Sequence, residues 1–167
     1  MAAAFISLGS NIAPEDNLRT AVRHLRAEFG ELRLSPVYRS AAVGFEGPDF
    51  LNAAAEVISE LPPAEIVNTL LQIEELCLRD RNQPRFSSRT LDLDLLMLGE
   101  LVIEEDRLTL PRPEILEEEF VLRPLADIAD TVRHPLAECT IGELLHRFQS
   151  SEAGARVDLI RVELALE

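Results

Sequence analysis

The sequence predicts an α+β fold, with helices packed on a mainly antiparallel sheet. Helix-period segments alternate with strand-like segments along the 167 residues, and several of the strand-like segments are apolar on one face only. The length is ordinary for one domain with a single core. We therefore expect residues 1–167 to form one domain, in which 151–167 is a tail whose packing the sequence leaves open.

Three strands and two helices are expected in the first half. Residues 4–8 form a short apolar run that ends at a glycine, which is typical of a buried strand. Residues 17–29 repeat apolar side chains at helical spacing, after a start signal at 14–16. Residues 32–38 resemble a strand in which Pro36 indicates an edge or a bulge.

A glycine-containing loop at 41–49 separates that strand from the next one, at 50–58. Two prolines at 62 and 63 then open a helix that runs through Leu76. Residues 79–88 are nearly free of apolar side chains and are expected to form a basic loop.

The second half is expected to contain strands at 91–98 and 101–103 and helices at 114–119 and 141–148. The partly alternating tail at 157–164 is a further candidate strand.

The charge balance excludes some classes of function. Sixteen Lys and Arg residues oppose 30 Asp and Glu residues, for a net charge of -14, and such a surface repels nucleic-acid phosphates. It still allows an enzyme that handles phosphates through magnesium and a few arginines.

Cys77 and Cys139 have no disulfide or zinc spacing, and no apolar run is long enough to span a membrane. We expect a cytoplasmic monomer without nucleic-acid or membrane partners.

Asp92 and Asp94 are the sharpest local feature. Alternate side chains share one face of a strand, so the two carboxylates point one way while Leu91, Leu93 and Leu95 point into a core. Carboxylates roughly 6–7 Å apart repel each other unless a cation lies between them. Hard oxygen ligands without a nearby His or Cys suit magnesium. The alternative is the acidic outer face of a half-exposed strand.

Four arginines directly precede these carboxylates, namely Arg79, Arg81, Arg85 and Arg89. Guanidinium groups beside metal-binding carboxylates provide what phosphoryl transfer requires, which is charge neutralisation and positioning. The alternative is a solvated loop whose arginines pair with the acidic surface. The sequence has no lysine and no glycine-rich phosphate loop, so arginine would be the phosphate ligand.

Phe50 and Asn52 share one face of their expected strand, where a flat heterocycle would stack on the ring and bind the amide. A core phenylalanine is the alternative. Gly9-Ser10-Asn11 is compatible with a tight turn near a ligand or with a simple turn. The three histidines are scattered, and none is assigned a catalytic role.

In this order, these segments resemble the 6-hydroxymethyl-7,8-dihydropterin pyrophosphokinases of folate biosynthesis. The most specific segment is 89–96, Arg-Thr-Leu-Asp-Leu-Asp-Leu-Leu, which is similar to the family signature. The resemblance runs from Ile6 to about Ile141. Other similar segments are Leu8-Gly-Ser-Asn11, Pro36-Val-Tyr-Arg-Ser40, Pro48-Asp-Phe-Leu-Asn52, Ile73-Glu74, Phe120-Val-Leu-Arg-Pro-Leu125 and His134-Pro135.

The resemblance implies a ferredoxin-like three-layer α/β/α sandwich. It also implies transfer of the β,γ-pyrophosphoryl group of ATP to the pterin hydroxymethyl oxygen, with release of AMP and with two Mg²⁺ ions bound to the phosphates. No strong general base is evident, and a loose transition state would need none.

Site residues follow from the same resemblance. Asp92 and Asp94 would bind both metal ions, and together with Arg79 and Arg89 they would form the catalytic set. The pterin-binding set would be Ser40, Ala41, Val43, Phe50, Asn52 and Phe120. The nucleotide-binding set would be Glu74, Arg81, Arg85, Leu95, Arg107, Thr109 and Arg112.

Two departures from the family pattern lie on the nucleotide side. Arg112 follows Pro111 where the family usually has histidine, and the acidic run 117–119 replaces a basic residue before Phe120. A carboxylate at Glu118 would raise the free energy of binding phosphates. A pterin- or nucleotide-binding paralogue on the same fold, non-catalytic or with another substrate, is the alternative function.

Overall fold

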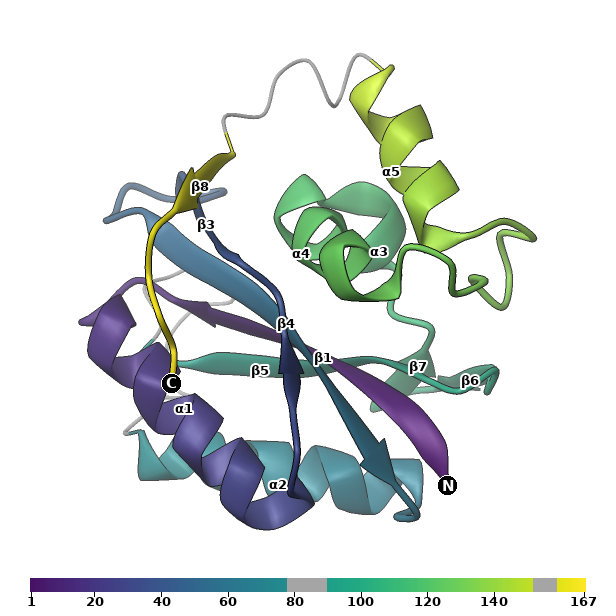
Figure 1. Cartoon of the computed structure of the whole chain (residues 1–167), viewed down its shortest axis with the longest axis horizontal. Coiled ribbons are helices and arrows are strands. Elements are labelled where there is room, and N and C mark those ends of the chain that lie inside the picture. Colours follow the sequence, from purple (N-terminus) through teal and green to yellow (C-terminus); the bar gives the residue numbers. More distant parts are fainter. Residues whose placement is uncertain (78–89, 152–158) are drawn as a thin grey trace.

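The computed structural model describes residues 1–77, 90–151 and 159–167. A mainly antiparallel sheet forms the middle of three layers, with helices α1 and α2 on one face and α3, α4 and α5 on the other (Figure 1). This arrangement confirms the expected α+β sandwich.

The main sheet has six strands, and all of its pairings are antiparallel. Its strand order is β5-β1-β4-β3-β8, with β2 also paired to β4. The strands are β1 (Ala2–Ser10), β2 (Arg33–Leu34), β3 (Val37–Ser40), β4 (Phe50–Ser59), β5 (Asp92–Leu98) and β8 (Ile160–Val162). A separate hairpin pairs β6 (Ile103–Glu105) with β7 (Leu108–Leu110).

Two helices bury one face of the sheet. They are α1 (Pro14–Phe29) and α2 (Pro63–Leu76). Their stripes, which include Leu25 and Ile66, pack on alternate strand residues such as Ile6, Leu8 and Leu93 to form the larger core cluster. The alternation expected for Leu91, Leu93 and Leu95 is therefore confirmed, because all three face this core.

The other face is only partly covered. It carries α3 (Glu114–Glu117), α4 (Glu119–Ala129) and α5 (Ile141–Gln149). Leu122 and Leu125 of α4 pack there on Phe5 and Leu96 of the sheet. The part of this face that α4 leaves open is where the site forms.

The expected strand at 32–38 is two strands. Between Leu34↔Ala55 and Tyr38↔Asn52 the register shifts by one residue. Ser35 lies at this bulge, where its backbone N–H donates to the Ala54 carbonyl and its hydroxyl accepts from the Ala54 N–H. Pro36, which follows, has no N–H for a continuous ladder.

The expected helix at 114–119 is wrong in extent. Glu118 has an extended backbone, with φ -127° and ψ 118°, so α3 ends there and α4 begins at Glu119. No helix was expected over 119–129, because Pro124 and the preceding acidic run obscure its apolar stripe.

Part of the tail packs on the domain. Strand β8 adds to the edge of the sheet beside β3, with Val162 opposite Val37. Leu166 is 6% exposed and joins the larger core.

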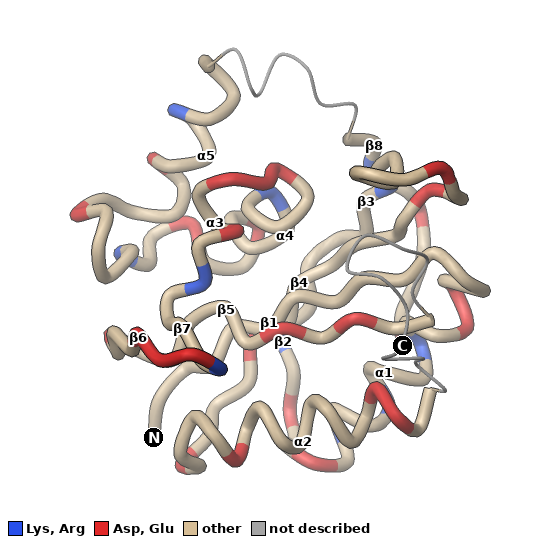
Figure 2. The backbone as a smooth tube through the Cα atoms, turned by 180° about the vertical axis from the view of Figure 1, so that it is seen from behind, with Lys and Arg blue, Asp and Glu red and all other residues tan. Residues whose placement is uncertain are grey.

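Acidic residues outnumber basic ones along the chain, and runs of them mark β6 and the segment from α3 to α4 (Figure 2). Within residues 1–77, 90–151 and 159–167, no helix combines the length and the apolar character needed to cross a membrane.

Candidate active site

Asp92 and Asp94 lie on β5, and both side chains point to the partly open face of the sheet. Both residues are half-buried. Burial and, after it, the charge of Asp92 raise the pKa of Asp94 to about 7, while the charge of Arg112 opposes this shift. The two carboxylates thus form a concentrated negative site that favours a bound cation.

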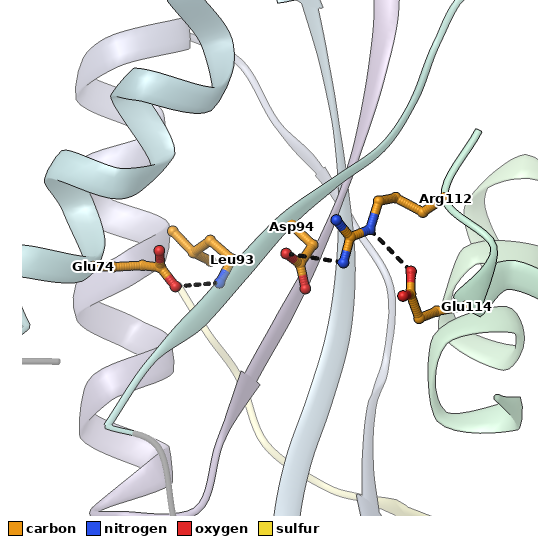
Figure 3. Close-up of polar contacts among 5 residues, drawn as sticks. All are labelled: Glu74, Leu93, Asp94, Arg112 and Glu114. Atoms are coloured by element: carbon orange, nitrogen blue, oxygen red, sulfur yellow. Dashed lines mark hydrogen bonds and ion pairs between the residues drawn. The ribbon is translucent and has the colours of Figure 1, made fainter. Parts of the chain in front are cut away.

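Arg112 is the cation that the structure places beside this pair. Its Nη2 lies 3.7 Å from Asp94 Oδ1, and its Nε donates to Glu114 Oε2 at 2.9 Å. Figure 3 shows the guanidinium between the two carboxylates, with Asp94 reaching it from β5 and Glu114 from α3. Glu114 therefore orients the guanidinium, which faces the same hollow as the aspartates.

The donor set fits a magnesium ion. Among the residues that the structure describes, no group of three or more His, Cys, Asp or Glu side chains is arranged to hold a metal. A site built from Asp92 and Asp94 alone leaves most coordination positions for water and phosphate oxygens, which is how Mg²⁺ binds beside nucleotides.

A hollow of about 320 Å³ opens in front of the carboxylates. It lies between the sheet and α4, so the lining residues come from both layers. All six residues of the expected pterin set line it together with both aspartates, namely Ser40, Ala41, Val43, Phe50, Asn52 and Phe120. The structure thus brings the expected metal and pterin residues into one cavity.

Aromatic rings line two walls of this cavity, one on the sheet and one on α4. Phe50 comes from β4 and Phe120 from the first turn of α4. Phe45, from the loop before β4, packs edge-on against Phe50 with ring centroids 6.4 Å apart. Phe45 is a lining residue that the sequence analysis did not select.

Asn52 is held by the neighbouring strand. Its Nδ2 donates to Ser40 Oγ at 2.8 Å and to the Tyr38 carbonyl at 3.4 Å. Its Oδ1 lies toward Gly9 of β1, where an added Cβ would come within 3.5 Å of it. The amide is 5% exposed and fixed, with an acceptor oxygen at the cavity wall.

The end of β1 joins the segments that flank the cavity. Ser10 Oγ donates to the Thr90 carbonyl at 2.5 Å, just before β5. Asn11 Nδ2 donates to the Pro48 carbonyl at 3.1 Å, in the loop before β4. The segment Gly9-Ser10-Asn11, which was expected to be a turn, is the last two residues of β1 and the residue after it. It lies near the site, and its polar side chains organise the two adjoining segments.

Four residues of the expected nucleotide set lie away from the cavity. Glu74 is 1% exposed and accepts a hydrogen bond from the Leu93 N–H at 3.2 Å, on the opposite side of β5 from Asp94 (Figure 3). Leu95 is buried in the larger core. Arg107 is exposed at the β6–β7 turn, and Thr109 is half-buried on β7.

The expected arginines at 79, 81, 85 and 89 lie outside the described residues.

Besides Phe45, the cavity is lined by Ser7, Glu114, Glu118 and Val121, which the sequence analysis did not assign to a ligand. Ser7 could have been selected from the sequence, because residues two apart on a strand share a face and Ser7 is two residues before Gly9 on β1. Burial and the neighbouring Glu117 and Glu114 carboxylates raise the pKa of Glu118.

A family model described as 7,8-dihydro-6-hydroxymethylpterin-pyrophosphokinase (HPPK) matches residues 5–130. The chain belongs to this family. The match runs from within β1 to the end of α4 and includes every described residue that lines the cavity.

Several curated relatives have the same name, 2-amino-4-hydroxy-6-hydroxymethyldihydropteridine pyrophosphokinase. The protein from Synechocystis is 40% identical over 147 residues, which are 86% of this chain and 75% of the relative. The protein from Haemophilus influenzae is 35% identical over 89% of this chain and 94% of its own length. The protein from Bacillus subtilis is 39% identical over 77% of this chain and 79% of its own length.

Solved structures support the fold. The Plasmodium falciparum HPPK-DHPS wild type with STZ-DHP superposes with a TM-score of 0.73 at 14% identity, over 93% of this chain. A structure of the same protein with pteroate has a TM-score of 0.69 over 89% of this chain. This chain spans less than half of those longer chains, 44% and 42% respectively.

Proposed function

We propose that this chain transfers the β,γ-pyrophosphoryl group of ATP to 6-hydroxymethyl-7,8-dihydropterin, giving AMP and the pterin pyrophosphate in folate biosynthesis. The observation that carries the proposal is the single cavity that contains both the Asp92–Asp94 pair and the aromatic-amide pocket. Membership of the family and the names of the relatives support the choice of substrates.

The pterin binds between the layers. Phe50 and Phe120 stack on the flat heterocycle, and the fixed Asn52 oxygen accepts from an N–H on its edge. Ser40, Ala41 and Val43 complete the pocket. The hydroxymethyl group then faces the acidic end of the cavity.

In this proposal, Asp92 and Asp94 would hold two Mg²⁺ ions together with the ATP phosphates. When bound, the metal neutralises phosphate charge and orients the β-phosphorus for in-line attack. Arg112 contacts the phosphates on the α3 side, because its guanidinium already faces the cavity. Arg79 and Arg89 stabilise the transferring group, while Arg81, Arg85, Arg107 and Thr109 surround the nucleotide. Glu74 and Leu95 are buried and support β5 from the side of the larger core.

In the transfer, the pterin hydroxymethyl oxygen forms a bond to the β-phosphorus. The bond from that phosphorus to the oxygen bridging to the α-phosphate breaks, and AMP leaves with the bonding electrons. The hydroxyl proton is lost late, to solvent water, because a loose transition state requires little nucleophilic push. Positioning by the two walls of the cavity is then the main contribution of this chain.

We also propose that residues 1–167 act as a monomeric, single-domain cytoplasmic enzyme without nucleic-acid or membrane partners. The net charge of -14 opposes binding to phosphate backbones. Cys77 and Cys139 are both free and buried, as expected in a reducing compartment.

The direct test incubates the protein with ATP, Mg²⁺ and the hydroxymethyl-dihydropterin and separates the nucleotides by chromatography. We expect AMP that depends on the pterin. ADP would indicate a different phosphoryl transfer, and pterin binding without any nucleotide product would favour the non-catalytic paralogue.

A further inference from the structure

Tyr38 is a buried tyrosine that connects the two walls of the cavity without being among the described residues that line it. It lies directly opposite Asn52 in the register of β3 and β4, and its carbonyl accepts from the Asn52 amide. Its side chain points to the face that α4 covers, where the hydroxyl donates to Asp127 Oδ2. One residue thus contacts the amide on one wall and the helix of the other.

Asp127 lies on the same stripe of α4 as the pocket aromatic. Phe120, Arg123 and Asp127 are spaced i, i+3 and i+7, which places them along one face of a helix. Arg123 lies over the Tyr38 ring, with its Cζ 5.6 Å from the ring centroid. The Tyr38 side chain therefore contacts α4 at two points below Phe120.

The hydrogen bonding of α4 makes this attachment important. Pro124 lies inside the helix and has no N–H, so the carbonyl of Phe120 lacks its usual partner four residues on. The first turn, which carries Phe120, is less firmly held by its own helix than a regular first turn would be. The contacts of Tyr38 with Arg123 and Asp127 attach the following turns of α4 to the sheet.

The hydroxyl remains a donor over the working pH range. Burial, followed by the hydrogen bond to Asp127 and the charge of Asp127, raises the pKa of Tyr38 above its ordinary value of 10.0. Tyr38 is 4% exposed, whereas Asp127 is exposed, so the hydrogen bond lies at the edge of the buried region.

We propose that Tyr38 and Asp127 are a positioning pair that fixes the spacing between the Asn52 wall and the Phe120 wall and thereby sets the affinity for the flat heterocycle. The inference rests on the proposed function, because the heterocycle is the pterin. It adds two residues that do not touch the substrate.

The test compares Tyr38→Phe, Asp127→Ala and Asp127→Asn by equilibrium binding of 6-hydroxymethyl-pterin and by steady-state kinetics. Loss of the hydrogen bond in Tyr38→Phe or Asp127→Ala should raise the pterin Kd and KM about tenfold, with kcat and the KM for ATP within about twofold. Asp127→Asn keeps an acceptor oxygen and should restore pterin affinity to within about twofold. The double variant Tyr38→Phe/Asp127→Ala should be no weaker than either single variant.

Thr69→Val is the matched control, since it removes a hydroxyl that donates to the Glu65 carbonyl on α2, away from the cavity.

A lower melting temperature with an unchanged pterin Kd in both single variants would overturn the inference and leave the proposed function intact. Additive losses in the double variant would also overturn it. Absence of pterin binding by the unaltered chain would overturn the proposed function and this inference together. Asp127 is exposed, so we expect its variants to fold. They test the inference even if Tyr38→Phe fails to fold.

Discussion

The Asp94 carboxylate on β5 lies 3.7 Å from the Arg112 guanidinium, which Glu114 holds from the other side. This contact joins the sheet to the segment before α3 across the acidic end of the cavity. Arg112 partly neutralises a carboxylate whose pKa burial and Asp92 raise to about 7. The acidic pair is thus suited to a more highly charged cation such as Mg²⁺.

Removing either carboxylate should abolish turnover without unfolding the chain. We expect Asp92→Ala and Asp94→Ala each to lower kcat at least about 100-fold, because the metal and the phosphates lose a ligand. Asp106→Ala is the matched control, since Asp106 is exposed at the β6–β7 turn. Steady-state AMP formation, with circular dichroism for the fold, measures the effect. Normal activity in either cavity variant would remove the metal assignment.

Asp94 should decrease the stability of the metal-free protein at high pH. Its folded-state pKa of about 7 lies above the ordinary 3.8, so the folded state retains a proton that the unfolded chain loses, and stability falls as pH rises from about 4 to 7. Asp94→Asn lacks this destabilising charge. With the side chain 35% exposed, solvent screening limits the gain to about 1 kcal/mol, or roughly 2–4 °C in Tm at pH 8.

Thermal melts with EDTA at pH 4 and pH 8 measure this effect, with Asp106→Asn as the control. The gain should vanish at pH 4, where Asp94 is protonated in the folded state. A gain of equal size at both pH values would contradict the electrostatic explanation.

Glu118 should weaken ATP binding. It lines the cavity close to Glu114 and Glu117, and its negative charge opposes the phosphates. We expect Glu118→Gln to lower the KM for ATP by about twofold to fivefold, with little change in the KM for the pterin. Glu117→Gln, at an exposed neighbour, should have a smaller effect. A raised KM for ATP in Glu118→Gln would indicate that the carboxylate assists binding.

Phe120 should be required for pterin affinity. Phe120→Leu keeps an apolar side chain but removes the stacking surface, so we expect the pterin KM to rise about fivefold to tenfold. Phe148→Leu is the control, because Phe148 packs on the same core cluster from α5 and is not among the described lining residues. Equal effects of the two variants on the pterin KM would indicate loss of packing in place of loss of stacking.

Much of the fold follows from local patterns. The apolar runs at β1 and β5 and the helical stripe of α1 were predicted because burial on the sheet dictates their periodicity. Helix α4 was not predicted, since Pro124 interrupts its apolar stripe and the extended backbone of Glu118 separates it from α3. Tertiary packing of Leu122 and Leu125 on the sheet overrides the local signal there.

The site was predictable to a similar degree. The alternation of Asp92 and Asp94 placed both on the correct face, and Phe50 and Asn52 followed from the same period of two. No local pattern brings Phe120 of α4 opposite Phe50, so that pairing came only from resemblance to the family. The buried place of Glu74 behind β5 depends on its bond to the Leu93 N–H, which joins residues far apart in the sequence.

Phosphorus NMR of a single reaction tests the central claim most directly, because it identifies which phosphorus atoms move. With ATP, Mg²⁺ and the hydroxymethyl-dihydropterin, we predict that the three ATP resonances give way to one AMP resonance and two coupled resonances of a pyrophosphate ester. The products should form in equal amounts, and none should form with Asp92→Ala. Resonances of ADP with a phosphomonoester, or of inorganic phosphate alone, would contradict pyrophosphoryl transfer by this chain.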